Sequence, residues 1–321
     1  MWLAPMSGAT DAAFRQQALR FGAPAVVSEM VAGEQLLAER SDVVRRTNRH
    51  EGVGLWIVQL AGRRPSDMLH GARRLSQDGV DVIDINMGCP SRQVTGGQSG
   101  SALMREPDLA KAIIDATIEG AGSTPVTLKM RLGWDHQSLN APVIASYAVS
   151  AGIQVITVHG RTRCQFYKGT ADWIRVRDTV DAVDVPVIVN GDIFDLPSAQ
   201  SAMAASGADG VMIGRAAMGR PWLIAEIAAG LEGRAFSPPD IAQKCDSLCE
   251  QIEESASLYG EGLGVRTARK HVSAAIDHVN LPLDTEVRRA IRADLCRIDD
   301  AAGLIAALRT VYSGRVWKAA A

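Results

Sequence analysis

Two basic residues stand two positions apart inside an apolar run of the sequence. Lys129 and Arg131 alternate with hydrophobic residues, so both cations point to the same side if the run forms a strand. If that side faces the interior of the protein, the two positive charges need a counter-ion or an anionic ligand. The reduced ring of a flavin is such a ligand, and an ion pair with an acid such as Asp84 is the alternative. His159, at the end of another apolar run, is either a cofactor contact or a core histidine.

Cys89 is a candidate for proton transfer. It follows an apolar run, precedes Pro90 and opens a glycine-rich stretch that ends at Gly100. A thiol exposed at the mouth of a barrel can act as a nucleophile, a metal ligand or a general acid. Thiols are ordinarily protonated at neutral pH, so Cys89 could donate a proton. A small buried cysteine that only packs is the alternative.

Two short glycine-containing sequences have the character of a phosphate site. Asn190, Gly191 and Asp192 follow one apolar run, and Gly214 and Arg215 follow the next. The loops after the seventh and eighth strands are where barrels commonly hold a phosphate, because backbone N–H groups approach its oxygens closely there. In isolation, glycines in such loops are as often turn residues.

These residues need a scaffold that brings them together. Short runs rich in valine and isoleucine recur, each followed by Gly, Pro or Asn and then by a helix-length segment, as in parallel βα units. The runs cover residues 1–6, 25–31, 55–60, 80–88, 125–132, 155–160, 186–191 and 210–214. Eight such strands predict an α/β protein with a (β/α)8 TIM barrel, and an open doubly wound sheet is the alternative. In a barrel the candidate residues meet at one mouth.

The alternation of strands and helices stops near Arg234, and Ser237-Pro238-Pro239-Asp240 indicates a hinge followed by a helix start. Beyond it, apolar residues recur every three or four positions. We therefore expect a catalytic barrel domain over residues 1–236 and a C-terminal helical bundle domain over residues 240–321.

Basic residues gather in the second half of this bundle. Arg266, Arg269 and Lys270 share one helix face, and Arg288 lies one turn before Arg292. Two such cationic stripes could follow a phosphate backbone. Charge runs of this kind are also common on solvated helix faces.

Composition excludes several classes of protein. The chain of 321 residues is 47% hydrophobic and 22% charged, which excludes intrinsic disorder, and its net charge of −2 excludes a uniformly basic nucleic-acid coat. The 5 cysteines lack repeated CxxC spacing, so we expect no metal site, no disulfide framework and a cytoplasmic protein with reduced thiols. Cys245 and Cys249 are one helical turn apart, but core packing explains them best. No targeting or membrane-spanning segment is found.

In combination, these sequences resemble the tRNA-dihydrouridine synthases, and most of all their bacterial B-type branch. The resemblance extends in order over nearly the whole chain. It is carried by Ala4-Pro5-Met6-Ser7-Gly8, Asp84-Ile85-Asn86-Met87-Gly88-Cys89-Pro90, Leu128-Lys129-Met130-Arg131-Leu132-Gly133-Trp134, Val158-His159-Gly160-Arg161-Thr162, Asn190-Gly191-Asp192-Ile193, Ile213-Gly214-Arg215-Ala216-Ala217 and Arg269-Lys270-His271-Val272-Ser273.

The resemblance implies an FMN-dependent enzyme that reduces uridine in tRNA to 5,6-dihydrouridine with NADPH. Matched position by position, FMN would be held by Pro5, Met6, Ser7, Gln59, Lys129, His159, Asn190, Gly191, Asp192, Gly214 and Arg215. Cys89 would protonate C5 of the uracil after hydride transfer to C6. Asn86, Arg131 and Tyr167 would face the substrate, and Arg266, Arg269 and Lys270 would contact the tRNA backbone. We expect no metal and a monomer.

Two departures from the family are visible. Ser91-Arg92-Gln93-Val94 stands where the B-type branch often has two lysines, which suggests an altered RNA contact. The sequence also begins almost at the first barrel strand, without the β-hairpin segment typical of the family. We expect either a less completely closed barrel bottom or a natural start further upstream.

Two other functions are compatible with the residues alone. An FMN barrel that reduces a free pyrimidine or another small enone would need the helical bundle only as structure, and the cationic stripes argue against it. An RNA-binding protein that remodels tRNA without turnover would have no use for Cys89 beside a flavin site.

Overall fold

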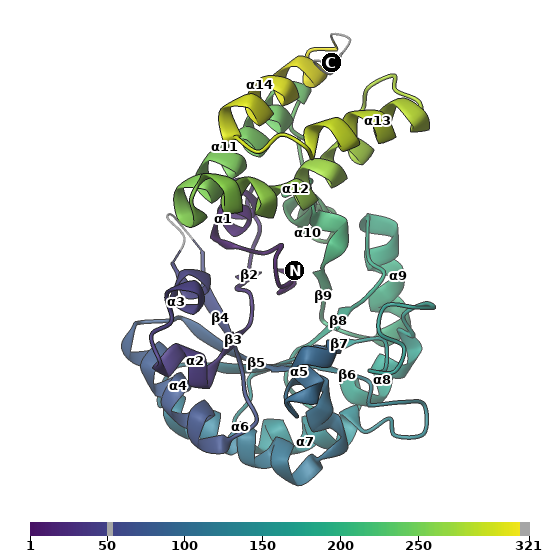
Figure 1. The fold of residues 1–321 in the computed structure, drawn as a ribbon. Helices are drawn as coiled ribbons and strands as arrows, with labels where there is room; N and C mark the ends of the chain where they lie inside the picture. The colour runs from purple at the N-terminus through teal and green to yellow at the C-terminus, as the bar shows by residue number, and fades with distance from the viewer. Residues whose placement is uncertain (50–53, 315–321) are drawn as a thin grey trace.

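The computed structural model describes residues 1–49 and 54–314, which form a parallel barrel with a group of helices above one side of it (Figure 1). The strands are β1 (Trp2–Leu3), β2 (Val26–Val27), β3 (Val31–Ala32), β4 (Trp56–Ala61), β5 (Val82–Met87), β6 (Val126–Arg131), β7 (Val155–His159), β8 (Val187–Asn190) and β9 (Gly210–Ile213). All their pairings are parallel.

The sheet closes on itself. Its order is β2-β1-β9-β8-β7-β6-β5-β4, and β2 also pairs with β4, with Val26 opposite Trp56. The barrel prediction is therefore confirmed and the open sheet is excluded. β3, a two-residue strand at the end of an expected run, pairs further along β4. β1 is shorter than expected because the ladder ends at the Ala4 N–H, which donates to Ile213, and Pro5 has no N–H to continue it.

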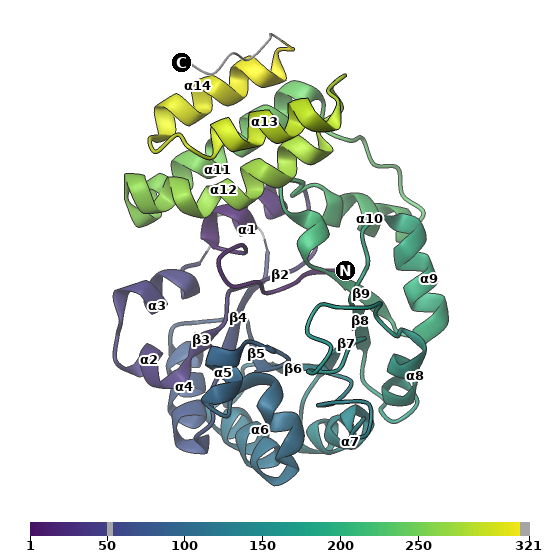
Figure 2. The ribbon, with the colours of Figure 1, turned by 45° about the vertical axis from the view of Figure 1, so that its right-hand side comes forward.

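Helices connect most of the strands, and most of these helices cover the outside of the barrel, as Figure 1 and Figure 2 show. They are α1 (Ala12–Arg20), α2 (Gly33–Leu37), α3 (Ser41–Thr47), α4 (Pro65–Gln77), α5 (Arg92–Gly96), α6 (Pro107–Ala121), α7 (Ala141–Ala151), α8 (Ile174–Val180), α9 (Leu196–Ser206) and α10 (Leu223–Leu231), with 3-10 turns at Gly100–Arg105 and Arg215–Ala217. No helix within the described residues is long and apolar enough to cross a bilayer.

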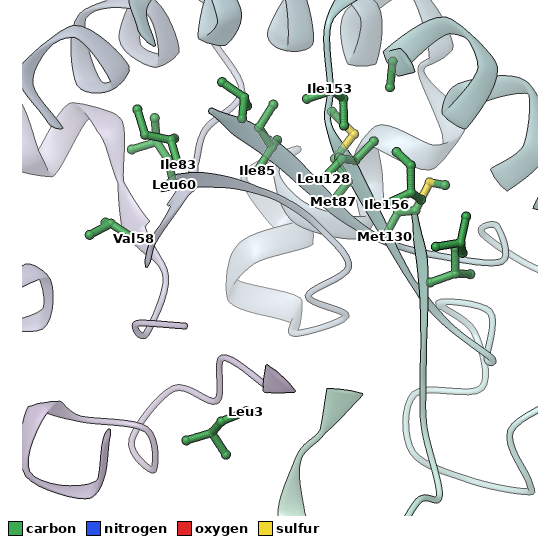
Figure 3. Packing of buried hydrophobic residues seen from close by; sticks show 14 of the residues in the cluster. Leu3, Val58, Leu60, Ile83, Ile85, Met87, Leu128, Met130, Ile153 and Ile156 are labelled. Carbon is green, nitrogen blue, oxygen red and sulfur yellow. The ribbon is translucent and has the colours of Figure 1, made fainter. Parts of the chain in front are cut away.

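Alternation along the strands separates two environments. Ile83, Ile85 and Leu128 belong to the large buried cluster between strands and helices, and Figure 3 shows them on the helix side of the sheet. The residues between them, such as Asp84 and Lys129, point to the opposite side, into the barrel. The interior of the barrel is therefore polar where β5 and β6 carry these residues, and a site can form there.

The C-terminal helices are α11 (Ile241–Tyr259), α12 (Glu261–His278), α13 (Thr285–Leu295) and α14 (Ala301–Tyr312). Asp240 caps α11 in a capping box with Gln243, where the sequence predicts a helix start. The four helices bury a hydrophobic cluster of their own, which includes Cys245 and Cys249. The described residues contain no group of His, Cys, Asp and Glu side chains that could hold a metal ion.

This helical group rests on the first helix of the barrel. The Ser247 hydroxyl donates to Gln17 at 2.9 Å, and Arg20 pairs with Glu250 and Glu254. His271, one of two histidines in α12, bonds through Nε2 to the backbone carbonyl of Ala9 on the barrel side of the contact. The helices α11 and α12 are thereby fixed beside the loop that follows β1.

Candidate active site

One large cavity, of about 780 Å³, opens at the carboxyl ends of the strands. Every site residue expected from the sequence lines it, except Arg266 and Arg269. The cavity also receives side chains that the sequence analysis did not single out, among them Arg161 and Phe194.

A chain of hydrogen bonds forms the wall below Cys89. Asp84 accepts from the hydroxyl of Thr127 and from the amide of Gln59, each at 2.6 Å. Gln59 in turn accepts from the Asn86 side-chain amide at 2.6 Å. The Asn86 carbonyl oxygen then accepts from the backbone N–H of Cys89 at 3.1 Å. Both ends of the Asn86 side chain are thus used to hold the loop that carries the thiol.

Lys129 is a buried cation without a bonded counter-ion. The structure shows no hydrogen bond or ion pair to its ammonium group within the described ranges, and the two oxygens of Asp84 bond to Thr127 and Gln59 instead. Burial, followed by the nearby charge of Arg131, lowers the pKa of Lys129 to about 8. The ion pair that was the alternative interpretation does not form, so an anionic ligand would compensate this charge best.

The guanidinium of Arg131 donates hydrogen bonds to backbone carbonyl groups. Its Nε donates to the carbonyl of Gly88 at 2.8 Å, and its Nη1 donates to the carbonyls of Thr162 and Phe166, both at 2.9 Å. Burial lowers the pKa of Arg131 to about 10, which leaves it charged at neutral pH. Arg131 therefore ties the loop after β5 to the loop after β7 while keeping its charge beside the cavity.

Cys89 lies half-exposed on the cavity wall. Its carbonyl accepts from both the N–H (3.1 Å) and the hydroxyl (2.8 Å) of Ser101. Gly100 has φ +60°, and a Cβ there would lie 2.9 Å from the Cys89 carbonyl oxygen, so only glycine lets the chain return this closely. The thiol is consequently presented by a loop fixed at both ends.

His159 and Arg161 come from the end of β7. The guanidinium of Arg161, only 2% exposed, pairs with Asp192 at 2.6 Å and donates to the carbonyls of Lys168 and Gly169. Its Nη1 lies 3.3 Å from Nε2 of His159. Oδ2 of Asp192 also accepts from the N–H of Ala171, so this carboxylate holds the loop in place and pairs its charge with that of Arg161.

The importance of Arg161 was missed from the sequence, although it stands two positions after His159. An arginine in a loop is usually solvated, and its role here depends on Asp192, which lies 31 positions further along the chain. The only signal was the short sequence His159-Gly160-Arg161 at a strand end.

The β8 and β9 side of the cavity carries the residues expected to hold a phosphate. Gly191 adopts φ +114°, and a Cβ there would lie 3.1 Å from His159 Nε2. Asn190 donates its side-chain amide to the carbonyl of Met212 at 2.7 Å. Arg215 is exposed, has no carboxylate partner in the described residues, and lies 5.2 Å from the centre of the Tyr167 ring.

The three basic residues of α12 have different surroundings. Lys270 reaches the cavity and donates to the carbonyl of Gly8 at 3.1 Å. Arg269 donates to the carbonyl of Ile298 at 2.9 Å and pairs with Asp299 at 2.5 Å. Arg266 is exposed and has no partner within the described part of the chain.

The chain is similar to proteins of known family over almost its whole length. A family model described as dihydrouridine synthase (Dus) matches residues 2–304. A "probable tRNA-dihydrouridine synthase" of Rhodobacter capsulatus is 47% identical over 315 residues, which cover 98% of this chain and 94% of that protein. The "tRNA-dihydrouridine synthase B" of Shewanella oneidensis is 40% identical over 302 residues, 94% of this chain and 91% of that protein.

Solved structures with a similar fold are much more distant in sequence. A 2-naphthoyl-CoA reductase matches with a TM-score of 0.55 at 13% identity, over 73% of this chain and 50% of that one. The histamine dehydrogenase from Rhizobium sp. 4-9 matches with a TM-score of 0.51 at 13% identity, over 79% of this chain and 48% of that one. At this identity the similarity supports the barrel fold alone.

Proposed function

Because this chain belongs to the dihydrouridine synthase family, we propose that it reduces uridine to 5,6-dihydrouridine in the D-loop of tRNA, with FMN as cofactor and NADPH as electron donor. The observation that carries the proposal is the cavity itself. It places Cys89 beside Lys129 and Arg131, two buried cations without a carboxylate partner in the described residues, and it opens towards Lys270 of the C-terminal helices.

The residues present fit a flavin. A volume of about 780 Å³ suits a cofactor-sized ligand. The uncompensated positive charge of Lys129 suits the negative charge that a reduced flavin ring carries. Arg215 is exposed and has no carboxylate partner among the described residues, so it suits a phosphate group. When bound, FMN would supply hydride transfer between the nicotinamide donor and C6 of the uracil.

Each part of the wall would have its own task in holding this group. Gln59, Lys129 and His159 would contact the ring, and Pro5, Met6 and Ser7 would border it from the loop after β1. The phosphate would lie at Asn190, Gly191, Gly214 and Arg215. Asp192 would act through its backbone and by keeping Arg161 in place, since its carboxylate is already bonded.

Cys89 would act as general acid. Its S–H proton would go to C5 of the uracil as C6 gains the hydride, and the thiolate would be reprotonated from solvent. Asn86 and Ser101 hold the loop in place, so the thiol is positioned before substrate binds. Arg131 and Tyr167 would border the uracil, and the target base would have to leave its stack to reach them.

The test is to map dihydrouridine by mass spectrometry in unmodified tRNA after incubation with the purified protein and NADPH. We expect dihydrouridine at a defined D-loop position. An FMN-loaded, NADPH-oxidising protein that left every tRNA uridine intact, yet reduced free uracil or another small enone, would replace the proposal by a small-substrate reductase.

The variant Cys89→Ala separates proton transfer from cofactor binding. We expect it to keep its flavin absorbance and lose about 100-fold or more of dihydrouridine formation, the usual contribution of general acid catalysis. Cys164→Ala, which changes an exposed cysteine outside the cavity, is the matched control and should behave as the unmodified protein. Loss of flavin from Cys89→Ala alone would contradict the assigned role.

A further inference from the structure

The contact between Arg161 and His159 restricts where the histidine can carry its proton. Nη1 of Arg161 lies 3.3 Å from Nε2 of His159. A guanidinium only donates hydrogen bonds, because it has no acceptor atom. Nε2 must therefore accept, so the proton of a neutral His159 ring has to be on Nδ1.

The surroundings of His159 keep its ring neutral. Burial lowers the pKa of His159 well below its ordinary value, and the cations Arg131, Lys129, Arg161 and Arg215 lower it further. Asp192 is the acid bonded to Arg161, which in turn contacts His159. Oδ2 of Asp192 accepts hydrogen bonds from Arg161 and from the N–H of Ala171. A second proton on the ring would add a like charge to four cations.

The ring is also held on its Nε2 side. A Cβ atom at Gly191 would lie 3.1 Å from Nε2 and 3.2 Å from Cδ2, so any side chain at this position would press on this edge of the ring. Within the residues that the structure describes, Nδ1 has no hydrogen-bond partner, and it is not one of the fully buried polar atoms without a partner. Since His159 lines the cavity, Nδ1 reaches accessible space there.

From this geometry we propose that Arg161 is a positioning residue, which fixes His159 as the Nδ1–H tautomer and so makes Nδ1 a hydrogen-bond donor directed into the cavity. The ligand atom is an acceptor on a planar heterocycle, either a carbonyl oxygen or an unprotonated ring nitrogen. Only this identification of the ligand rests on the proposed function. The tautomer belongs to the protein alone.

The proposal is tested on the ligand-free protein by NMR of 15N-labelled histidine. Long-range 1H–15N spectra distinguish the two tautomers, and the His159 signals are identified by their disappearance in His159→Asn. We expect a pyrrole-type Nδ1 and a pyridine-type Nε2, with no titration between pH 6 and 8. A pyrrole-type Nε2, or a doubly protonated ring in this range, would overturn the proposal.

A pair of variants shows whether Arg161 is the cause. Arg161→Met should give a mixture of tautomers and a higher His159 pKa, because one donor and one nearby positive charge are removed. Arg163→Met, which removes an arginine from the same loop, should leave the His159 pattern unchanged. An unchanged pattern in Arg161→Met would contradict the causal role. If Arg161→Met does not fold, the tautomer of the unmodified protein still decides the proposal.

Addition of ligands identifies the acceptor. FMN alone, uridine monophosphate alone, and both together are titrated into the labelled protein. A change of the Nδ1–H proton and nitrogen shifts with FMN indicates a flavin acceptor, and a change that needs the nucleotide indicates a pyrimidine acceptor. If neither ligand moves these signals, Nδ1 is no ligand donor and the functional half of the inference is wrong. A failure of tRNA reduction would leave all these readouts intact.

Discussion

At the scale of single residues, the cavity is a place where charge is held without full compensation. Lys129 loses its hydration on burial, and Asp84, the acid that could have balanced it, is itself engaged with Gln59 and Thr127. Burial raises the pKa of Asp84 and lowers that of Lys129, so each group resists its charged form. A bound anion would stabilise the charged form of Lys129, which burial destabilises.

This imbalance predicts proton uptake on cofactor binding. The pKa of Lys129 in the free protein is about 8, below the ordinary 10.5. From pH 8 to 10.5 the unfolded chain binds more protons at this lysine, so its contribution to stability rises with pH in that window. An anionic ligand favours the protonated form and raises the pKa, so binding should take up a fraction of one proton near pH 8.5. The phosphate group of FMN is fully ionised there and contributes none.

The measurement is anaerobic isothermal titration of reduced FMN, whose ring carries the negative charge, into the apoprotein in two buffers of different ionisation enthalpy. Lys129→Met should abolish the uptake and weaken binding. Lys168→Met, at an exposed lysine on the loop after β7, should retain the uptake and serves as control. Proton release, or uptake that persists in Lys129→Met, would show that the charge is balanced in another way.

Much of the site was predictable at this scale, because alternation along a strand decides which side a residue faces. Lys129 and Arg131 were expected on one side for this reason, and they both line the cavity. The partners of each side chain were not predictable. That Asp84 would bond to Gln59 and Thr127 depends on the register between strands, which a single sequence does not specify. That Asp192 would bond to Arg161 depends on how the loops after β7 and β8 pack together.

At the scale of elements, the C-terminal helices depend on close approaches between backbones. A Cβ on Gly264 of α12 would lie 2.3 Å from the carbonyl oxygen of Ser255 and 2.5 Å from Cα of Ala256, both in α11. The two helices therefore cross at a glycine. Gly262, two residues earlier in α12, has no atom of the described residues within 4 Å of its Cβ position, its chain neighbours and its own helix backbone apart.

These two glycines form a matched pair for mutation. Gly264→Ala should destabilise the helical group by about 1–3 kcal/mol, because backbone atoms have to move apart. Gly262→Ala should be neutral or stabilise by up to about 1 kcal/mol through helix propensity. Urea unfolding gives the free energies, and hydrogen exchange of α11 and α12 amides localises the effect. Equal stability of the two variants would mean that the helices do not approach as closely as described.

The element order was predictable and the crossing was not. The barrel strands and the capped start of α11 follow from local patterns, such as apolar runs and the pair Asp240 and Gln243. The β1 strand was predicted too long because the run continues past Pro5. Gly264 lies in an unremarkable stretch of α12, and its contact with Ser255 arises only when the two helices pack.

At the scale of the whole molecule, α12 links the helical group to the cavity. His271, fully buried, donates through Nε2 to the carbonyl of Ala9 at 2.8 Å and accepts through Nδ1 from the N–H of Gly219 at 3.4 Å. Burial lowers its pKa to about 4, so the ring stays neutral. One neutral side chain thus fixes the loops after β1 and β9, and its neighbour Lys270 lies at the cavity rim.

The same packing decides which basic side chains of the C-terminal helices are already bonded within the protein. Arg288 donates to the carbonyls of Ile276, Val279, Leu281 and Leu283, so it stabilises the end of α12. Arg292 pairs with Asp277. Arg288 and Arg292, the second cationic stripe expected from the sequence, therefore bond mainly to other parts of the protein. Helix spacing predicts that the two residues share a face, but it does not predict which partners other segments will supply.

Arg266 is the residue on which the expected contact of α12 with the tRNA backbone depends most directly. It is exposed on α12, has no partner in the described residues, and stands one turn before Lys270. Each phosphate contact changes the slope of log binding constant against log salt by about 0.7–0.9. Arg266→Gln should therefore weaken tRNA binding and flatten this slope by about that amount, as measured by filter binding or fluorescence anisotropy over a salt series.

Arg73 provides the control for that measurement. It is also exposed, but it lies near the end of α4, which returns the chain to the amino end of β5 and so to the side of the barrel away from the cavity. Arg73→Gln changes the net charge equally and should leave the slope unchanged. If both variants flatten the salt slope equally, tRNA binding depends only on the net charge of the protein. If neither does, the backbone passes elsewhere, and Lys270 at the rim becomes the residue to replace next.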